Sequence, residues 1–173
     1  MIFVEPRPIG RGTIFGIAHK LDRGDDMYIP FGKPEAMAKV SGGAKAPSLF
    51  GSVKFYQMTN GVLVVVDIGG LPESDTGIFA LHIHEGSSCQ GQGFPNTGNH
   101  YNPGGNSHPS HAGDLPPLFS CDGRAFLVVL TDRFQIPQII GRTVLIHGKP
   151  DDFISQPSGN AGEKIACGII AAM

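Results

Sequence analysis

Short apolar and β-branched runs, separated by turn-forming residues, organise this chain. Residues 51–58 alternate, so that Val53 and Phe55 share one face of a strand and the intervening side chains share the other. Thr-Asn-Gly then leads into a second run at residues 61–68, an order typical of a β-hairpin. No segment sustains a 3.6-residue apolar period over three turns. The pattern therefore predicts an all-β protein.

Five further runs have the length and composition of strands. They are residues 78–84, 125–132, 143–148 and 165–173, with a weaker candidate at residues 36–42. The 25 glycines and 14 prolines among 173 residues supply many turns between these runs. Seven or so short strands punctuated in this way favour an antiparallel sandwich or flattened barrel, in one domain large enough for a real core.

Two long stretches without a strand pattern interrupt this plan. Residues 85–124 form the first and residues 148–164 form the second. Loops of this length in a compact domain are usually functional or disordered. The first contains many side chains that can bind a metal, so we expect it to be a functional loop.

Composition and charge exclude some classes of function. The net charge of −2 gives no general attraction to nucleic acid or anionic lipid, and no apolar run approaches the roughly 20 residues that span a membrane. The first 23 residues contain Glu5 and prolines, and they lack the continuous apolar core of an export signal. The compartment stays open: cytoplasmic if this chain is complete, extracytoplasmic if it is a processed form.

Histidine is concentrated in one part of the chain. Six of the seven histidines lie between positions 82 and 147, namely His82, His84, His100, His108, His111 and His147. His82 and His84 are two apart on an expected strand, so both imidazoles share one face while the residues beside them enter the core. Neutral imidazole is a favoured ligand of copper and zinc, so we expect a metal site.

The number of donors bears on the number of metals. His108, His111 and Asp114 form a compact group of nitrogen and oxygen donors, and Asp114 with the six histidines makes seven donor side chains. Two four-coordinate ions need eight ligands unless one is shared, and an imidazolate can bridge two ions through its two ring nitrogens. The count permits a dinuclear site without requiring one.

Several motifs, in a fixed order, resemble one known family. They are LHIHEG at 81–86, GNHYNPGG at 98–105, HAGDLPPL at 111–118, GRTVLIHGKPDD at 141–152 and SGNAGEKIACGII at 158–170. Together they are similar to the copper,zinc superoxide dismutases in their bacterial form, over a domain of residues 36–173. The resemblance implies an eight-stranded Greek-key β-barrel, or flattened sandwich, with two long functional loops. Residues 1–35 match no part of the family and are expected to form an N-terminal extension that is partly disordered, in which His19 is not a ligand.

The resemblance also implies a ligand set, carried over position by position. Asp151 matches the aspartate that links two metal sites by accepting from the non-coordinating nitrogens of a copper histidine and a zinc histidine. Copper would be held by His82, His84, His100 and His147. Zinc would be held by His100, which forms the bridge, and by His108, His111 and Asp114.

Other positions match the family or depart from it. Cys89 and Cys167 match its disulfide, which leaves Cys121, the third cysteine, as a free thiol. Lys164 stands where many members have an arginine that guards the copper. Lysine keeps the charge but lacks the planar donor fork of arginine, so we expect activity at a reduced level. The loop between Asp152 and Lys164 is also short, which puts its steering role in doubt.

The implied activity is that of an oxidoreductase. The resemblance implies disproportionation of superoxide to O₂ and hydrogen peroxide by Cu(II)/Cu(I) cycling, with the four copper histidines and Lys164 as the catalytic set. The expected partner is the superoxide anion, with no nucleic acid and no membrane, and with a homodimer left open. The alternative is a non-catalytic scaffold or copper carrier on the same fold. Loss of a copper histidine would favour that alternative, and none is lost.

Overall fold

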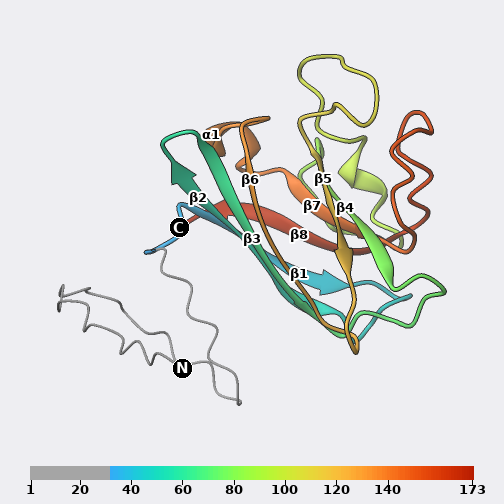
Figure 1. Ribbon diagram of the computed structural model, residues 1–173. Coiled ribbons are helices and arrows are strands. Elements are labelled where there is room, and N and C mark those ends of the chain that lie inside the picture. The colour runs from blue at the N-terminus through green and yellow to red at the C-terminus, as the bar shows by residue number, and fades with distance from the viewer. Residues whose placement is uncertain (1–31) are drawn as a thin grey trace, which may run out of the picture. The chain divides into compact units, whose positions relative to one another are not determined.

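The computed structural model describes residues 32–173, which form an all-β fold (Figure 1). Its strands are β1 (Ala36–Gly42), β2 (Phe50–Met58), β3 (Gly61–Gly69), β4 (Ile78–His84), β5 (Asp114–Phe119), β6 (Ala125–Thr131), β7 (Thr143–His147) and β8 (Lys164–Ala172). Helical structure within these residues is limited to a 3₁₀ turn, η1 (Pro95–Thr97), and one α-helical turn, α1 (Ile136–Ile139). The expected all-β class is confirmed.

The eight strands form one antiparallel sheet in the order β5-β4-β7-β8-β1-β2-β3-β6. The chain leaves β3 for β4 and β6 for β7 without pairing those consecutive strands, which is the long return of a Greek key. The two ends of the order, β5 and β6, approach each other, so the sheet curls into a nearly closed barrel (Figure 1). The expected Greek-key barrel is confirmed.

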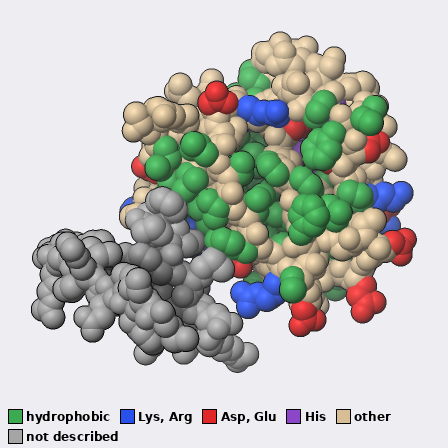
Figure 2. Space-filling model, viewed as in Figure 1, with side chains coloured by type: hydrophobic (Ala, Val, Ile, Leu, Met, Phe, Trp, Pro, Cys, Tyr) green, Lys and Arg blue, Asp and Glu red, His purple; other side chains and the backbone are tan. Residues whose placement is uncertain are grey.

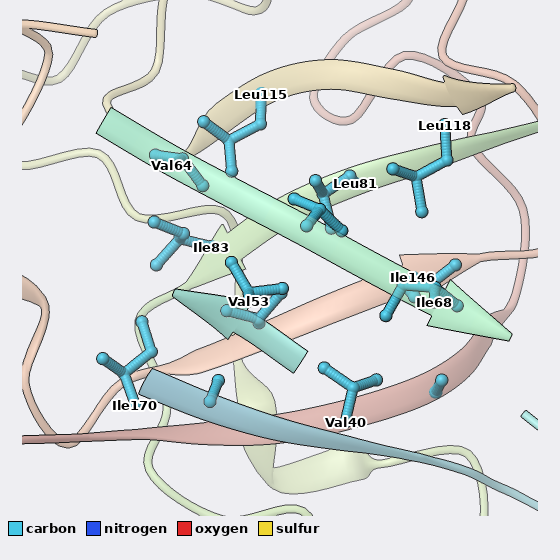
Figure 3. Close-up of a cluster of buried hydrophobic side chains, with 14 of the residues drawn as sticks. Val40, Val53, Val64, Ile68, Leu81, Ile83, Leu115, Leu118, Ile146 and Ile170 are labelled. Atoms are coloured by element: carbon cyan, nitrogen blue, oxygen red, sulfur yellow. The ribbon is translucent and has the colours of Figure 1, made fainter. Parts of the chain in front are cut away.

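The core fills the inside of this barrel because each strand sends alternate side chains inward. Figure 3 shows Leu81 and Ile83 of β4 pointing into the same cluster as Val53 of β2 and Val64 of β3. Leu81 and Ile83 are fully buried in this cluster. The two positions that alternate with them on β4 therefore lie on the opposite face, where the sequence places histidine.

The predicted loop of residues 85–124 is wrong at its end, because it contains β5. Two consecutive prolines, Pro116 and Pro117, argue against a strand in the sequence, because proline has no backbone N–H to donate to the hydrogen bonds between strands. In the barrel, β5 stands at the end of the hydrogen-bonded order, and its prolines fall in the irregular stretch between the paired residues Leu115 and Leu118. An edge strand tolerates proline at such a place. The other seven strands match their predicted ranges to within one residue at each end.

The predicted N-terminal extension, residues 1–35, lies largely outside the described residues, as does His19. The division at residue 36 stays a prediction, and β1 begins at Ala36. Within residues 32–173, no helix is long and apolar enough to cross a membrane.

The outer face of β6 is unusually apolar. Phe126, Val128 and Leu130 point outward and are exposed, whereas the alternating Leu127 and Val129 pack against the core. Figure 2 shows hydrophobic side chains gathered on this side of the molecule. The homodimer that the sequence leaves open is not tested by the structure of a single chain.

Candidate metal centre

The seven donor side chains named from the sequence come together on one side of the barrel. They are His82 and His84 of β4, His147 of β7, Asp114 at the start of β5, and His100, His108 and His111 of the loop between β4 and β5. All seven are buried. Burial of this many polar side chains in one place demands hydrogen-bond or metal partners.

The loop is fixed against β4 by backbone hydrogen bonds. The N–H of Tyr101 donates to the carbonyl of Ile83 at 2.8 Å, and the N–H of Ile83 donates to the carbonyl of Gly113 at 2.9 Å. The N–H of Gly113 in turn donates to the carbonyl of Tyr101 at 2.8 Å. A Cβ at Gly113 would overlap the Ile83 carbonyl, so only glycine allows this approach. The result places His100 beside His84, with which it forms a β-bridge.

The donors form two overlapping groups, and within each group the ligand atoms lie within 4.8 Å of one another. The first group consists of His82, His84, His100 and His147. The second group consists of His100, His108, His111 and Asp114. His100 is shared, which is the arrangement that two four-coordinate ions need when only seven side chains are present.

Three ring nitrogens support a metal at this place. Among residues 32–173, His82 Nδ1, His100 Nε2 and His108 Nδ1 are buried and have no hydrogen-bond partner. His108 Nδ1 lies 3.1 Å from an Asp114 oxygen without making a hydrogen bond to it. Buried nitrogen lone pairs without a partner are costly, and a metal ion would satisfy them. The donor set therefore fits copper and zinc.

A close contact between two neutral histidines, His84 and His147, also supports a metal ion at this place. His84 Nδ1 donates to the carbonyl of Gly98 at 3.0 Å, and His147 Nδ1 donates to the carbonyl of Gly162 at 3.2 Å. Burial lowers the pKa of His84 to about 2 and that of His147 to about 3, so both rings are neutral. Their Nε2 atoms then face each other at 3.3 Å with lone pairs only, an arrangement that a cation would stabilise.

Asp151 connects the two groups through histidine nitrogens that face away from the shared site. Its Oδ2 accepts from His82 Nε2 and its Oδ1 accepts from His108 Nε2, each at 2.8 Å. Burial alone would raise the pKa of Asp151, but hydrogen bonds from His82, from the N–H of Phe153 and from His108 lower it to about 2. An ionised Asp151 keeps both histidines protonated at Nε2, which leaves each Nδ1 free to bind a metal.

Lys164 places a positive charge beside the first donor group. It opens β8 opposite His147, and its Nζ donates to Thr97 Oγ1 at 2.7 Å and to the Gly98 carbonyl at 3.2 Å. Partial burial lowers the pKa of Lys164, and its charge in turn contributes to the lowered pKa of His84.

The predicted disulfide is present. Cys89 and Cys167 are joined, which ties the ligand loop to β8 across a sequence separation of 78. Among the described residues, Cys121 is a free and exposed cysteine, as predicted.

Sequence reasoning missed three residues that hold this site together. Thr97 accepts from Lys164, Gly159 packs against Asp151, and Arg133 Nη1 donates to the carbonyls of Pro109, His111 and Asp114. Their partners lie 8 to 67 positions away in the chain. No local pattern in the sequence predicts contacts between residues so far apart.

Comparisons with known proteins agree with this geometry. The family described as Copper/zinc superoxide dismutase (SODC) matches residues 49–170. Superoxide dismutase [Cu-Zn] 2 of Aquifex aeolicus is 33% identical over 137 residues, which cover 70% of this chain and 79% of the relative. Superoxide dismutase [Cu-Zn] of Legionella pneumophila is 34% identical over 134 residues, 72% of this chain and 79% of the relative. The human copper chaperone for superoxide dismutase is 34% identical over 135 residues, 70% of this chain and 48% of the relative.

Proposed function

Because the chain belongs to the copper/zinc superoxide dismutase family, we propose that it disproportionates superoxide at a copper and zinc centre. In this reaction two superoxide anions and two protons give one O₂ and one hydrogen peroxide. The observation that carries the proposal is the pair of overlapping donor groups with His100 in both. A family member that had lost its redox site would not need to keep four buried histidines around one point.

The ligands follow from which nitrogens are available. Copper would be held by His82 through Nδ1 and by His84, His100 and His147 through Nε2. Zinc would be held by His100, His108, His111 and Asp114. Bound copper supplies one-electron chemistry, taking an electron from one superoxide and returning it to a second, while zinc keeps its oxidation state.

His100 and Asp151 have proton-handling and orienting roles. His100 Nε2 is the buried nitrogen that faces the other three histidines of its group. With zinc at the other ring nitrogen of His100, Nε2 would be the atom that can take up a proton when it is not bound to copper. It can therefore supply one of the two protons that the product requires. Asp151 holds the rings of His82 and His108 in the tautomer that binds through Nδ1.

Lys164 attracts and holds the anionic substrate. A positive charge about 5 Å from an anion, at an effective dielectric constant of ~20, contributes roughly 3 kcal/mol before screening. The local charge therefore matters more than the net charge of −2. Lysine offers fewer fixed donors than arginine, so the rate should be lower than with a guanidinium in this position.

The test combines metal content with catalysis. The full chain is loaded with copper and zinc, the metals are counted, and superoxide removal is measured beside a His147→Ala variant. About one copper and one zinc per chain, with activity that disappears in the variant, are expected. Full metal content without catalysis would instead favour a non-catalytic scaffold or copper carrier. The similarity to a copper chaperone for superoxide dismutase is the reason to test this alternative.

A further inference from the structure

Thr97 has an unusual environment for a hydroxyl group. It ends η1, its side chain is completely buried, and its Oγ1–H donates to the carbonyl of Phe94 at 2.8 Å. A hydroxyl has one proton to donate, so the remaining lone pairs of Oγ1 can only accept. The donor that they meet is the ammonium of Lys164 at 2.7 Å, which makes Thr97 a built acceptor for this lysine.

The second tether of Lys164 is shared with a histidine of the first donor group. The Gly98 carbonyl accepts from Lys164 Nζ at 3.2 Å and also from His84 Nδ1 at 3.0 Å. Both lone pairs of this carbonyl are therefore engaged, and the Lys164 bond is the longer of the two. The short bond to Thr97 is the one that sets where the ammonium stands.

A lysine needs such a tether more than an arginine does. Its charge sits on a flexible four-carbon stem, whereas a guanidinium is a rigid fork with five donors. An ammonium has three N–H donors, and the two hydrogen bonds that the described residues provide leave one for an anion. Held in this way, the Lys164 ammonium stands at the start of β8, beside the first donor group. The backbone of Lys164 pairs with that of His147.

We propose that Thr97 is a positioning residue that fixes the Lys164 ammonium for anion binding beside the copper histidines. The proposal rests on the proposed function for the role of Lys164, and it assigns a role to a residue outside the ligand set. In the absence of the Thr97 acceptor, Lys164 would sample its other rotamers and spend less time where an anion arrives.

The test is a double-mutant cycle on the copper- and zinc-loaded full chain. Thr97→Val keeps the shape of the side chain but removes the acceptor, Thr97→Ser restores it, and Lys164→Met removes the donor. Thr143→Val is the matched control, because Thr143 is also fully buried and its hydroxyl donates to a loop carbonyl, that of Gly86 at 3.2 Å. Two readouts are taken: superoxide removal, and the affinity of the copper(II) form for azide, a non-reacting anion followed by its absorption band.

Thr97→Val is expected to weaken azide binding and to lower the rate by about three- to tenfold at unchanged metal content. Thr97→Ser and Thr143→Val should stay close to the parent protein. In the Lys164→Met background, Thr97→Val should change neither readout further, because the interaction that it removes is already absent.

Equal losses from Thr97→Val in both backgrounds, loss of metal, or no effect in the parent background would overturn the positioning role. A parent protein that binds both metals but removes no superoxide would overturn the proposed function instead. The azide cycle would still decide on Thr97 in that case, so the two failures are distinguishable.

Discussion

Gly159 packs directly against the carboxylate of Asp151. A Cβ at Gly159 would overlap Asp151 Oδ1 and lie 2.7 Å from His108 Nε2. The backbone of Gly159 has a φ of 65°, in the region that favours glycine, and its carbonyl accepts from the N–H of Asp152 at 2.9 Å. The loop before β8 therefore closes over the link between the two donor groups and leaves no room for a side chain.

Gly159→Ala is expected to weaken metal binding by about 10- to 100-fold, because the added methyl displaces the Asp151 carboxylate from its histidines. Gly105→Ala is the matched control, since Gly105 has a φ of 63° and an added Cβ there meets no atom of the described residues within 4 Å. Both variants carry the backbone cost of about 1 kcal/mol in stability. Competition with a chelator measures the affinity. Equal metal affinities in the two variants would contradict this account.

Asp151→Asn should weaken copper binding more than it lowers the stability of the fold. An amide keeps one acceptor oxygen, so it can serve either His82 or His108 but not both. The histidine that loses its acceptor also loses its fixed tautomer, and we expect a decrease in metal affinity of about 10- to 100-fold. Chelator competition and urea unfolding of the same sample separate the two effects. A copper affinity equal to that of the parent would disprove the orienting role of Asp151.

The metal-free protein should lose stability as the pH falls. His84 and His147 have folded-state pKa values of about 2 and 3, lowered by burial, against about 6.5 in an unfolded chain. Between about pH 6.5 and 3 the unfolded state binds more protons than the folded state, so acid favours unfolding. Each of the two histidines contributes a slope of up to about 1.4 kcal/mol per pH unit in that window.

Urea unfolding of the metal-free protein from pH 8 to pH 4 measures this dependence. Above pH 7 the contribution of the two histidines is fully present and the stability should be level with respect to them. A double variant, His84→Ala with His147→Ala, should show a shallower slope. A stability that stays constant from pH 8 to pH 4 in the parent protein would refute the burial of neutral histidines.

How much the sequence predicts depends on whether the signal is local. The seven strands with alternating or β-branched patterns were placed to within one residue, because a period of two is visible inside each segment. The strand β5 is not predicted from the sequence, because Pro116 and Pro117 interrupt the residue pattern that is typical of a strand. Only its pairing with β4 in the folded protein identifies it. The same division holds for the site. The donor types and their spacing point to a metal, whereas the contact of Thr97 with Lys164 exists only after folding.

The disulfide should account for a large share of the stability of the fold. Cys89 and Cys167 close a loop with a sequence separation of 78, which is worth about 4 kcal/mol in the chain-entropy account. A variant with both cysteines replaced by serine should lose stability of that order in urea unfolding. Cys121→Ser is the control, because Cys121 is exposed, and it should change the stability by less than about 0.5 kcal/mol. A double variant as stable as this control would show that the bond constrains little.

Arg133 should stabilise the second donor group without touching a metal. Its Nη1 donates to the carbonyls of Pro109 at 2.9 Å, His111 at 3.2 Å and Asp114 at 3.3 Å. These carbonyls belong to the segment that carries the proposed zinc ligands, so the guanidinium holds the segment in one conformation from the end of β6. Arg133→Met removes the donors and keeps much of the apolar stem, and we expect it to weaken zinc binding several-fold while copper binding changes less.

The matched control for Arg133→Met is Arg124→Met, because Arg124 is an exposed arginine near the start of β6 whose ion-pair partner, Asp67, lies 3.8 Å away. That variant removes the same charge at the opposite end of β6, away from the proposed zinc ligands, and should leave both affinities unchanged. Zinc and copper are titrated separately, each with a chelator of matched affinity. Equal weakening of both metals by Arg133→Met would mean that Arg133 supports the barrel as a whole, and not the zinc segment.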